Sequence, residues 1–161
     1  MIRAALVSLL LLCPSALFAQ SQLERLEAVS EQMNLEMAKM MAREISANGG
    51  DPAPVMAALP DTSWDDEYRA AGTCMLNQYN AAAGTQGTDS MLDKMEAMIP
   101  QLETATMESL ENMDVRPEGV SEDQSIQIAR SCGMIDLSMR RMQESGFTAA
   151  MMQAFSEAQG N

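Results

Sequence analysis

The sequence contains no histidine, and this absence removes several kinds of catalytic site at once. A Ser-His-Asp triad, a Cys-His pair, an HExxH zinc site and a histidine proton shuttle all depend on an imidazole. We therefore expect none of the common hydrolytic mechanisms. The interpretation that follows is a non-enzymatic protein with no cofactor and no bound metal.

Basic residues are also scarce. Ten Lys and Arg stand against 23 Asp and Glu, which gives a formal net charge of −13. A negative charge repels the phosphate backbone of nucleic acids and the headgroups of anionic lipids. We expect no nucleic-acid partner.

Apolar runs are short, and the longest one lies near the N-terminus. Arg3 precedes an apolar run of about ten residues that ends at Cys13, which is the layout of a secretory signal peptide. The run has about half of the roughly 20 residues that a membrane-spanning helix needs. Leu12 is larger than the small residue that normally precedes a lipid-modified cysteine, so Cys13 fits lipid attachment poorly. We predict a signal peptide over residues 1–19, cleaved after Ala19, and no stable membrane anchor in the mature chain.

The mature chain would be a periplasmic or secreted domain over residues 20–161. Its length fits one domain, since domains commonly have about 100 to 150 residues. Removal of Arg3 leaves 9 basic against 23 acidic residues, a net charge of −14.

Cysteine is rare as well, and cleavage would leave only Cys74 and Cys132. Exported chains meet an oxidising environment, so we predict a disulfide between these two residues. Neither belongs to a CxxC pair, which favours a structural bond that joins two helices at mid-length. Free thiols or metal binding are the alternatives.

Helical periodicity is what the sequence does contain, and no segment alternates like a half-buried strand. Capping residues, glycines and prolines delimit the predicted elements. Four main helices are predicted over 21–48, 63–83 (capped by Ser63), 88–113 (kinked or restarted at Pro100) and 121–145, with short helical segments over 53–59 and 148–155. The predicted fold is all-α: a small antiparallel bundle of about four main helices plus short helices, with one interhelix disulfide.

Methionine is the unusual component, with 17 residues against three Phe, one Trp and two Tyr. Its helical spacing is typical of a core, in which Met fills irregular gaps and Trp64 and Tyr68 are unusually large. Thioethers also bind Cu(I), so a Met-rich periplasmic copper-binding protein is one alternative. Flexible methionines can also line an apolar binding patch. The residues that we assign to such a patch are Met40, Met41, Met95, Met98, Met151 and Met152.

Acidic residues offer a second alternative. Asp65, Asp66 and Glu67 follow Trp64, an arrangement that would suit a carboxylate-based glycan hydrolase. The first turn of a helix also attracts acidic residues through its dipole alone. The function that we expect is an interaction or chaperone-like accessory module, with an unknown protein or apolar ligand as its partner.

Overall fold

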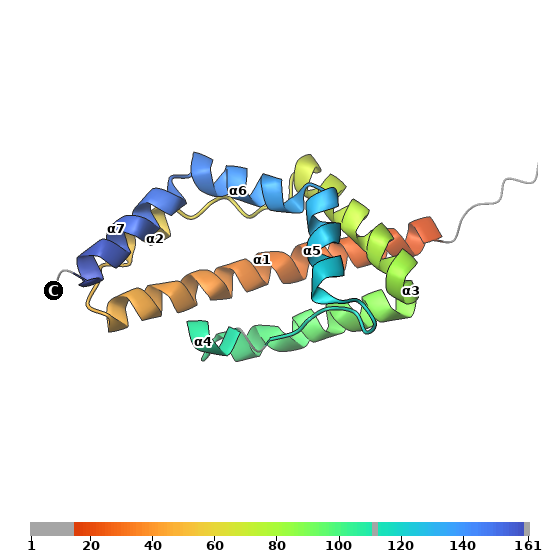
Figure 1. The fold of residues 1–161 in the computed structure, drawn as a ribbon, viewed down its shortest axis with the longest axis horizontal. Helices are drawn as coiled ribbons and strands as arrows, with labels where there is room; N and C mark the ends of the chain where they lie inside the picture. Colours follow the sequence, from red (N-terminus) through yellow and green to blue (C-terminus); the bar gives the residue numbers. More distant parts are fainter. Residues whose placement is uncertain (1–14, 111–112, 160–161) are drawn as a thin grey trace, which may run out of the picture.

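The computed structural model describes residues 15–110 and 113–159, and these contain seven α-helices and no β-strand (Figure 1). The prediction of an all-α fold is thereby confirmed for the described chain. Most of the predicted signal peptide lies outside these residues. The helices are α1 (Ser15–Ala47), α2 (Ala53–Ala57), α3 (Asp66–Leu102), α4 (Met107–Leu110), α5 (Glu122–Ser131), α6 (Met134–Glu144) and α7 (Phe147–Gln159).

Helix α1 extends along the length of the molecule (Figure 1). Its end agrees with the prediction: Gly49 adopts a φ of +79°, and the backbone N–H of Gly50 donates to Ile45 O at 2.9 Å. This left-handed glycine is a common way for a helix to end. The predicted start at Ser21 is wrong, because the helix already begins at Ser15. Leu17 and Ala19 are good helix formers, so the chain ahead of Ser21 continues the helix instead of ending in a cap.

Helix α3 consists of two limbs joined at Gly84. Gly84 has a φ of 74° and a ψ of 165°, a conformation essentially restricted to glycine. We call residues 66–83 the first limb and residues 85–102 the second limb. The sequence predicted a break at 84–87, and the structure reduces it to this single residue.

Both ends of α3 differ from the prediction. The N-cap is Asp65, whose Oδ1 accepts from the backbone N–H groups of Glu67 and Tyr68 at 3.1 and 3.0 Å. Ser63 instead donates to Asp61. The helix ends at Leu102, two residues after Pro100, and the predicted continuation to 113 is replaced by a turn and the four-residue α4.

The two limbs run in opposite directions beside α1 (Figure 1). Along the first limb the partners are antiparallel, because Asn80 bonds Gln22 whereas Arg69 bonds Glu27. Along the second limb the two helices are parallel, because Gln22 bonds Asp89 and Arg25, further along α1, bonds Glu96, further along α3. The reversal at Gly84 therefore gives an arrangement that is antiparallel on one side of α1 and parallel on the other.

The predicted helix over 121–145 is two helices. Ser121 is the N-cap of α5 as predicted, and its hydroxyl accepts from the backbone N–H of Gln124 at 3.2 Å. Gly133 then has a φ of +76° and separates α5 from α6. Helix α7 begins at Phe147, whose N–H donates to Ser145 Oγ, so Thr148 is not its cap.

The interior is divided into two apolar clusters. The first lies between α1, both limbs of α3 and α5, and its buried residues are Leu26, Val29, Leu76, Tyr79, Met91, Leu92, Val120 and Ile128. The second is smaller and joins the end of α1 to α2 and α7 through Ile45, Val55 and Ala154. Trp64 packs against the first cluster, which confirms its predicted place in the core.

Gly72 in the first limb lies against Trp64, so Gly72→Ala should destabilise the protein. A Cβ at Gly72 would come within 2.7 Å of Trp64 Cη2 and 3.2 Å of Leu23 Cδ1. Overpacking of this kind typically costs about 1–3 kcal/mol. Urea unfolding, followed by the emission of the single tryptophan, should show a lower midpoint and a shifted native spectrum. The exposed Ala70→Ser serves as the control, and unchanged emission and stability in Gly72→Ala would contradict this packing.

Candidate functional site

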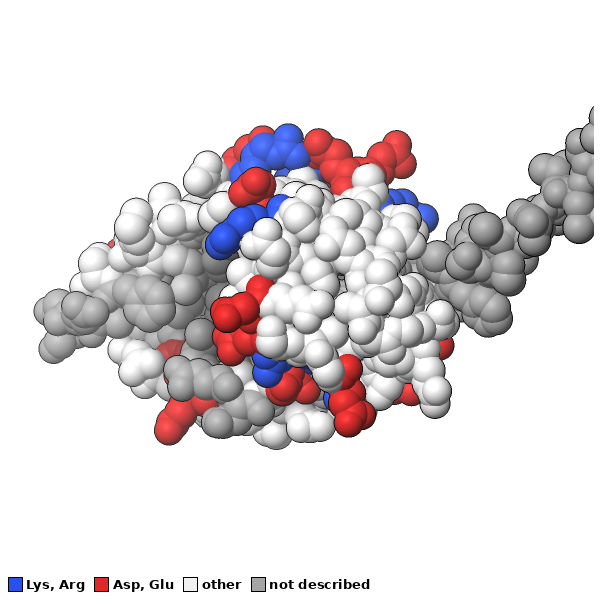
Figure 2. All heavy atoms as spheres, turned by 45° about the vertical axis from the view of Figure 1, so that its right-hand side comes forward, with Lys and Arg blue, Asp and Glu red and all other residues white. Residues whose placement is uncertain are grey.

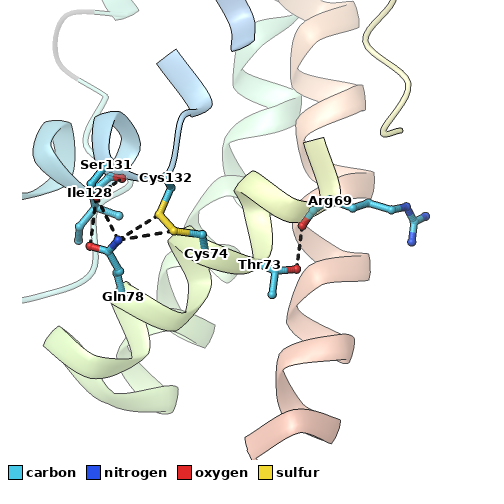
Figure 3. Close-up of a disulfide and its surroundings, with 7 residues drawn as sticks. All are labelled: Arg69, Thr73, Cys74, Gln78, Ile128, Ser131 and Cys132. Atoms are coloured by element: carbon cyan, nitrogen blue, oxygen red, sulfur yellow. Dashed lines mark hydrogen bonds between the residues drawn. A yellow bond between two sulfur atoms is a disulfide. The ribbon is translucent and has the colours of Figure 1, made fainter. Parts of the chain in front are cut away.

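Cys74 and Cys132 are joined in the structure, as the sequence predicted. Their sulfur atoms are 2.01 Å apart, and the bond connects the first limb of α3 to the residue that follows α5 (Figure 3). The prediction that it joins two helices at mid-length is wrong for Cys132. This residue is the C-cap of α5, because Gly133 ends the helix there.

The side chain of Gln78 makes polar contacts with both sulfur atoms of the disulfide. Its Nε2 donates to Ser131 Oγ at 3.0 Å and lies 3.1 Å from Cys132 Sγ and 3.6 Å from Cys74 Sγ (Figure 3). The hydroxyl of the adjacent residue, Tyr79, lies 2.7 Å from Ser125 Oγ. The covalent bond and these hydrogen bonds hold α5 in a fixed position on the first limb.

The six methionines assigned to a binding patch do not share one exposed surface. Met40 is fully buried and Met98 is 8% exposed, so the assignment is wrong for these two, whose places on apolar helix faces put them in the interior. Met95 is half-buried against the first cluster and Met151 is half-buried against the second. Met41 is also half-buried, whereas Met152 is 65% exposed.

Exposed large apolar side chains are likewise scattered among the described residues. They lie on four different helices and are Leu35, Ile126, Met139 and Met152. Single exposed apolar residues are normal on soluble proteins. The apolar binding surface expected from the methionine content therefore has no support in the arrangement of these side chains.

A surface without charge is the feature that sequence reasoning missed. Residues 70–88, 19 consecutive positions between Arg69 and Asp89, contain no charged side chain, although charged residues make up 20% of the chain. The middle of α5, residues 124–129, contains no charged side chain either. Figure 2 shows a broad uncharged area on the side where α3 and α5 lie. The uncharged run itself was the signal in the sequence.

We call this surface the neutral face and define it by its exposed residues. They come from α3 and α5 and are Asn77, Ala81, Ala82, Thr85, Gln86, Gln124, Ile126 and Gln127. Four of the eight are side-chain amides, which can both donate and accept hydrogen bonds. Ile126, 42% exposed, is the largest apolar side chain among them.

Acidic and basic side chains gather instead where α3 begins. Arg140 and Arg141 of α6 both donate to Glu67 Oε2, at 2.8 and 2.9 Å, and Arg141 also donates to Asp65. The Arg141 guanidinium lies 5.9 Å from the ring centre of Tyr68. These contacts fix α6 to the start of α3.

Two of the three carboxylates expected for a glycan hydrolase, Asp65 and Glu67, are engaged in this structural role. The pKa of Asp65 is lowered, chiefly because the backbone N–H of Tyr68 donates to its carboxylate, with Arg141 contributing. A general acid needs the opposite, a raised pKa. The Trp64 ring stacks near Tyr68, with ring centres 6.1 Å apart.

The described surface includes two shallow hollows. One, of about 440 Å³, lies beside the disulfide and is lined by Cys132, Gly133, Glu67 and Arg140 among others. The other, of about 330 Å³, lies between α1 and the second limb, with Val29 and Ile99 among its lining residues. Neither hollow brings together three or more residues that could ligate a metal, and no such group occurs elsewhere in the described chain.

None of the described helices combines the length and the apolar character needed to cross a membrane. No protein-family model, curated protein or solved structure matches the chain. The function is therefore argued from its residues and their arrangement.

Removing the disulfide should weaken the fold strongly. Loss of a native disulfide in a small exported domain typically costs about 2–5 kcal/mol. Cys74→Ala should therefore lower the melting temperature and leave Cys132 open to thiol labelling, whereas the unreduced wild type should show no free thiol after denaturation. Two labelled cysteines in the oxidised wild type would refute the bond.

The Asp65 cap should make stability depend on acid pH. Because the folded state lowers the pKa of Asp65 below its usual 3.8, the carboxylate stabilises the fold above that pH, and this contribution is lost as the pH falls through the lowered value. Asp65→Ala should therefore lower the melting temperature at pH 7 and lower it much less at pH 2. Asp66→Ala, which removes an adjacent acid without a cap bond, is the control. An equal deficit of Asp65→Ala at both pH values would argue against this account.

Proposed function

We propose that this protein is an exported, non-enzymatic interaction module, and that the neutral face is the surface on which it binds another protein. The single observation that carries the proposal is the composition of that face. The cores of protein interfaces are depleted of charged residues relative to the rest of the surface. On a chain of net charge −13, the uncharged exposed residues of α3 have the composition of such a core, and α5 adds Gln124, Ile126 and Gln127 beside its own exposed charges at Glu122, Asp123 and Arg130.

The support beneath the face also favours binding. The first limb of α3 is joined to α5 by the Cys74–Cys132 bond and by the hydrogen bond from Gln78 to Ser131. Leu76, Tyr79 and Ile128 of these two elements are buried in the first cluster beneath the face. A surface that is already ordered loses little side-chain and backbone entropy when a partner binds.

The proposal changes one part of the expectation from the sequence. We expected an apolar, methionine-lined surface that would take a polypeptide or an apolar ligand. The neutral face is made of amides and small residues, with Ile126 as its one large apolar side chain. A protein surface able to form hydrogen bonds suits it better than an apolar small molecule.

The proposal that the protein is exported rests on the predicted signal peptide. Arg3 and the apolar run behind it support export, and the disulfide is the kind of bond that an oxidising compartment maintains. The mass of the protein isolated from the exported fraction would show whether residues 1–19 have been removed.

Charging the neutral face should abolish binding. Ala81 is exposed on the first limb, so Ala81→Glu can be tolerated by the fold and yet place a carboxylate in the interface. Capture of partners by the tagged protein from the exported fraction, with quantification by mass spectrometry, should show specific partners for the wild type and at least about tenfold less of them for the variant.

The matched control is Gln143→Glu, which adds the same charge at an exposed position of α6 outside the neutral face. It should bind as the wild type does. If Ala81→Glu captures the same partners in the same amounts, the neutral face is not the binding surface. If the wild type instead cleaves a glycan and captures nothing, the protein is an enzyme and the proposal is wrong.

A further inference from the structure

The high methionine content plays no part in the neutral face, none of whose defining residues is a methionine. The fold sorts the methionines by their exposure. Met40, Met91 and Met98 are buried, at 0%, 5% and 8% exposed, whereas Met139 and Met152 are 46% and 65% exposed. A dissolved oxidant can reach the exposed sulfur atoms far more readily than the buried ones.

Met151 combines access to solvent with a place in an apolar contact. Its side chain is half-buried and packs against the second cluster. Met33, Met75 and Met95 are half-buried too, but they pack against the first cluster, which is larger and lies beneath the disulfide-linked first limb and α5. A change in the polarity of one methionine therefore has its greatest structural effect at Met151.

Helix α7 depends on this second cluster for its position. It contacts α1, α2 and α6 at the end of the molecule where α1 ends (Figure 1). The side-chain hydrogen bonds of Gln153 and Ser156 are made within α7 itself. The residues that pack α7 into the second cluster are apolar and are Phe147, Ala150, Met151 and Ala154.

We propose that Met151 is an oxidation site, and that its conversion to the sulfoxide by a peroxide loosens α7 from α1 and α2. The thioether sulfur donates an electron pair to one oxygen of hydrogen peroxide, so that an S–O bond forms while the O–O bond breaks. The second oxygen takes the proton of the first and leaves as water. The sulfur is oxidised, the peroxide is reduced, and the product is a polar side chain that an apolar cluster does not accommodate.

The small size of the second cluster makes it sensitive to one polar group. Its buried residues are Ile45, Val55 and Ala154, and a region with few buried apolar groups is held in place by little free energy. The neighbouring Met152 is 65% exposed, so its oxidation leaves the cluster unchanged. The site lies outside the neutral face, so the oxidation and the proposed function can be tested separately.

Oxidation of the purified, folded protein with hydrogen peroxide, followed by peptide mass mapping, tests the site. Met139 and Met152 should be oxidised first, Met151 next and Met40 last, in the order of their exposure. Hydrogen exchange measured by mass spectrometry should then show the amides of α7 exchanging at least about tenfold faster in the oxidised protein. Trp64 emission should stay unchanged, because the first cluster remains packed.

Two leucine variants separate Met151 from the exposed methionines. Met151→Leu removes the sulfur and nearly keeps the volume, so α7 should exchange equally slowly before and after treatment with peroxide. Met152→Leu is the matched control and should respond to peroxide as the wild type does. Met151→Gln, which places a polar group in the cluster, should speed the exchange of α7 without any oxidant.

Three results would overturn the inference. The first is a Met151 that stays reduced while the folded protein is oxidised elsewhere. The second is an oxidised Met151 with the exchange of α7 unchanged. The third is a peroxide-treated Met151→Leu variant in which α7 exchanges as fast as in the treated wild type.

Discussion

The side chain of Gln22 joins α1 to both limbs of α3, and the rest of the arrangement depends on that junction. Gln22 is 2% exposed; its oxygen accepts from Asn80 Nδ2 at 2.9 Å, and its Nε2 donates to Asp89 Oδ1 at 2.8 Å. A buried amide is costly unless its hydrogen bonds are made, so this geometry is selected over other packings of the same helices. Among the described residues, the side-chain oxygen of Asn80 is also buried and has no hydrogen-bond partner.

Few basic residues are present, and those that form ion pairs largely connect helices. Arg25 of α1 reaches Asp93 and Glu96 of α3, and the hydrogen bond to Glu96 is the main reason for its raised pKa. Arg69 reaches back from α3 to Glu27. Exposed pairs such as these contribute only about 0–1 kcal/mol each, so they orient helices more than they stabilise them. The arginines that form these ion pairs lie where helices meet, and none of them belongs to the neutral face.

Local signals in the sequence predicted the elements better than their arrangement. Glycine and capping residues predicted that α1 ends just before Gly49 and that α5 begins just after Ser121, because these effects act within a few residues. The division at Gly133 was missed because the apolar periodicity continues through it. The direction of the second limb depends on the backbone angles at Gly84, which composition does not encode. For the site, the cysteine count predicted the disulfide, whereas periodicity alone could not tell a buried Met40 from an exposed Met152.

The division of the interior into two clusters has a consequence for how the molecule opens. The first cluster is enclosed by the disulfide and by two long limbs, whereas the second consists of Ile45, Val55 and Ala154 at the far end of α1, outside the covalent loop. Small clusters with few buried apolar groups open at lower free energy than the whole domain. We expect α2 and α7 to detach and reattach while the rest stays folded. Proteolysis of the native protein would then begin at the C-terminal end and spare the neutral face.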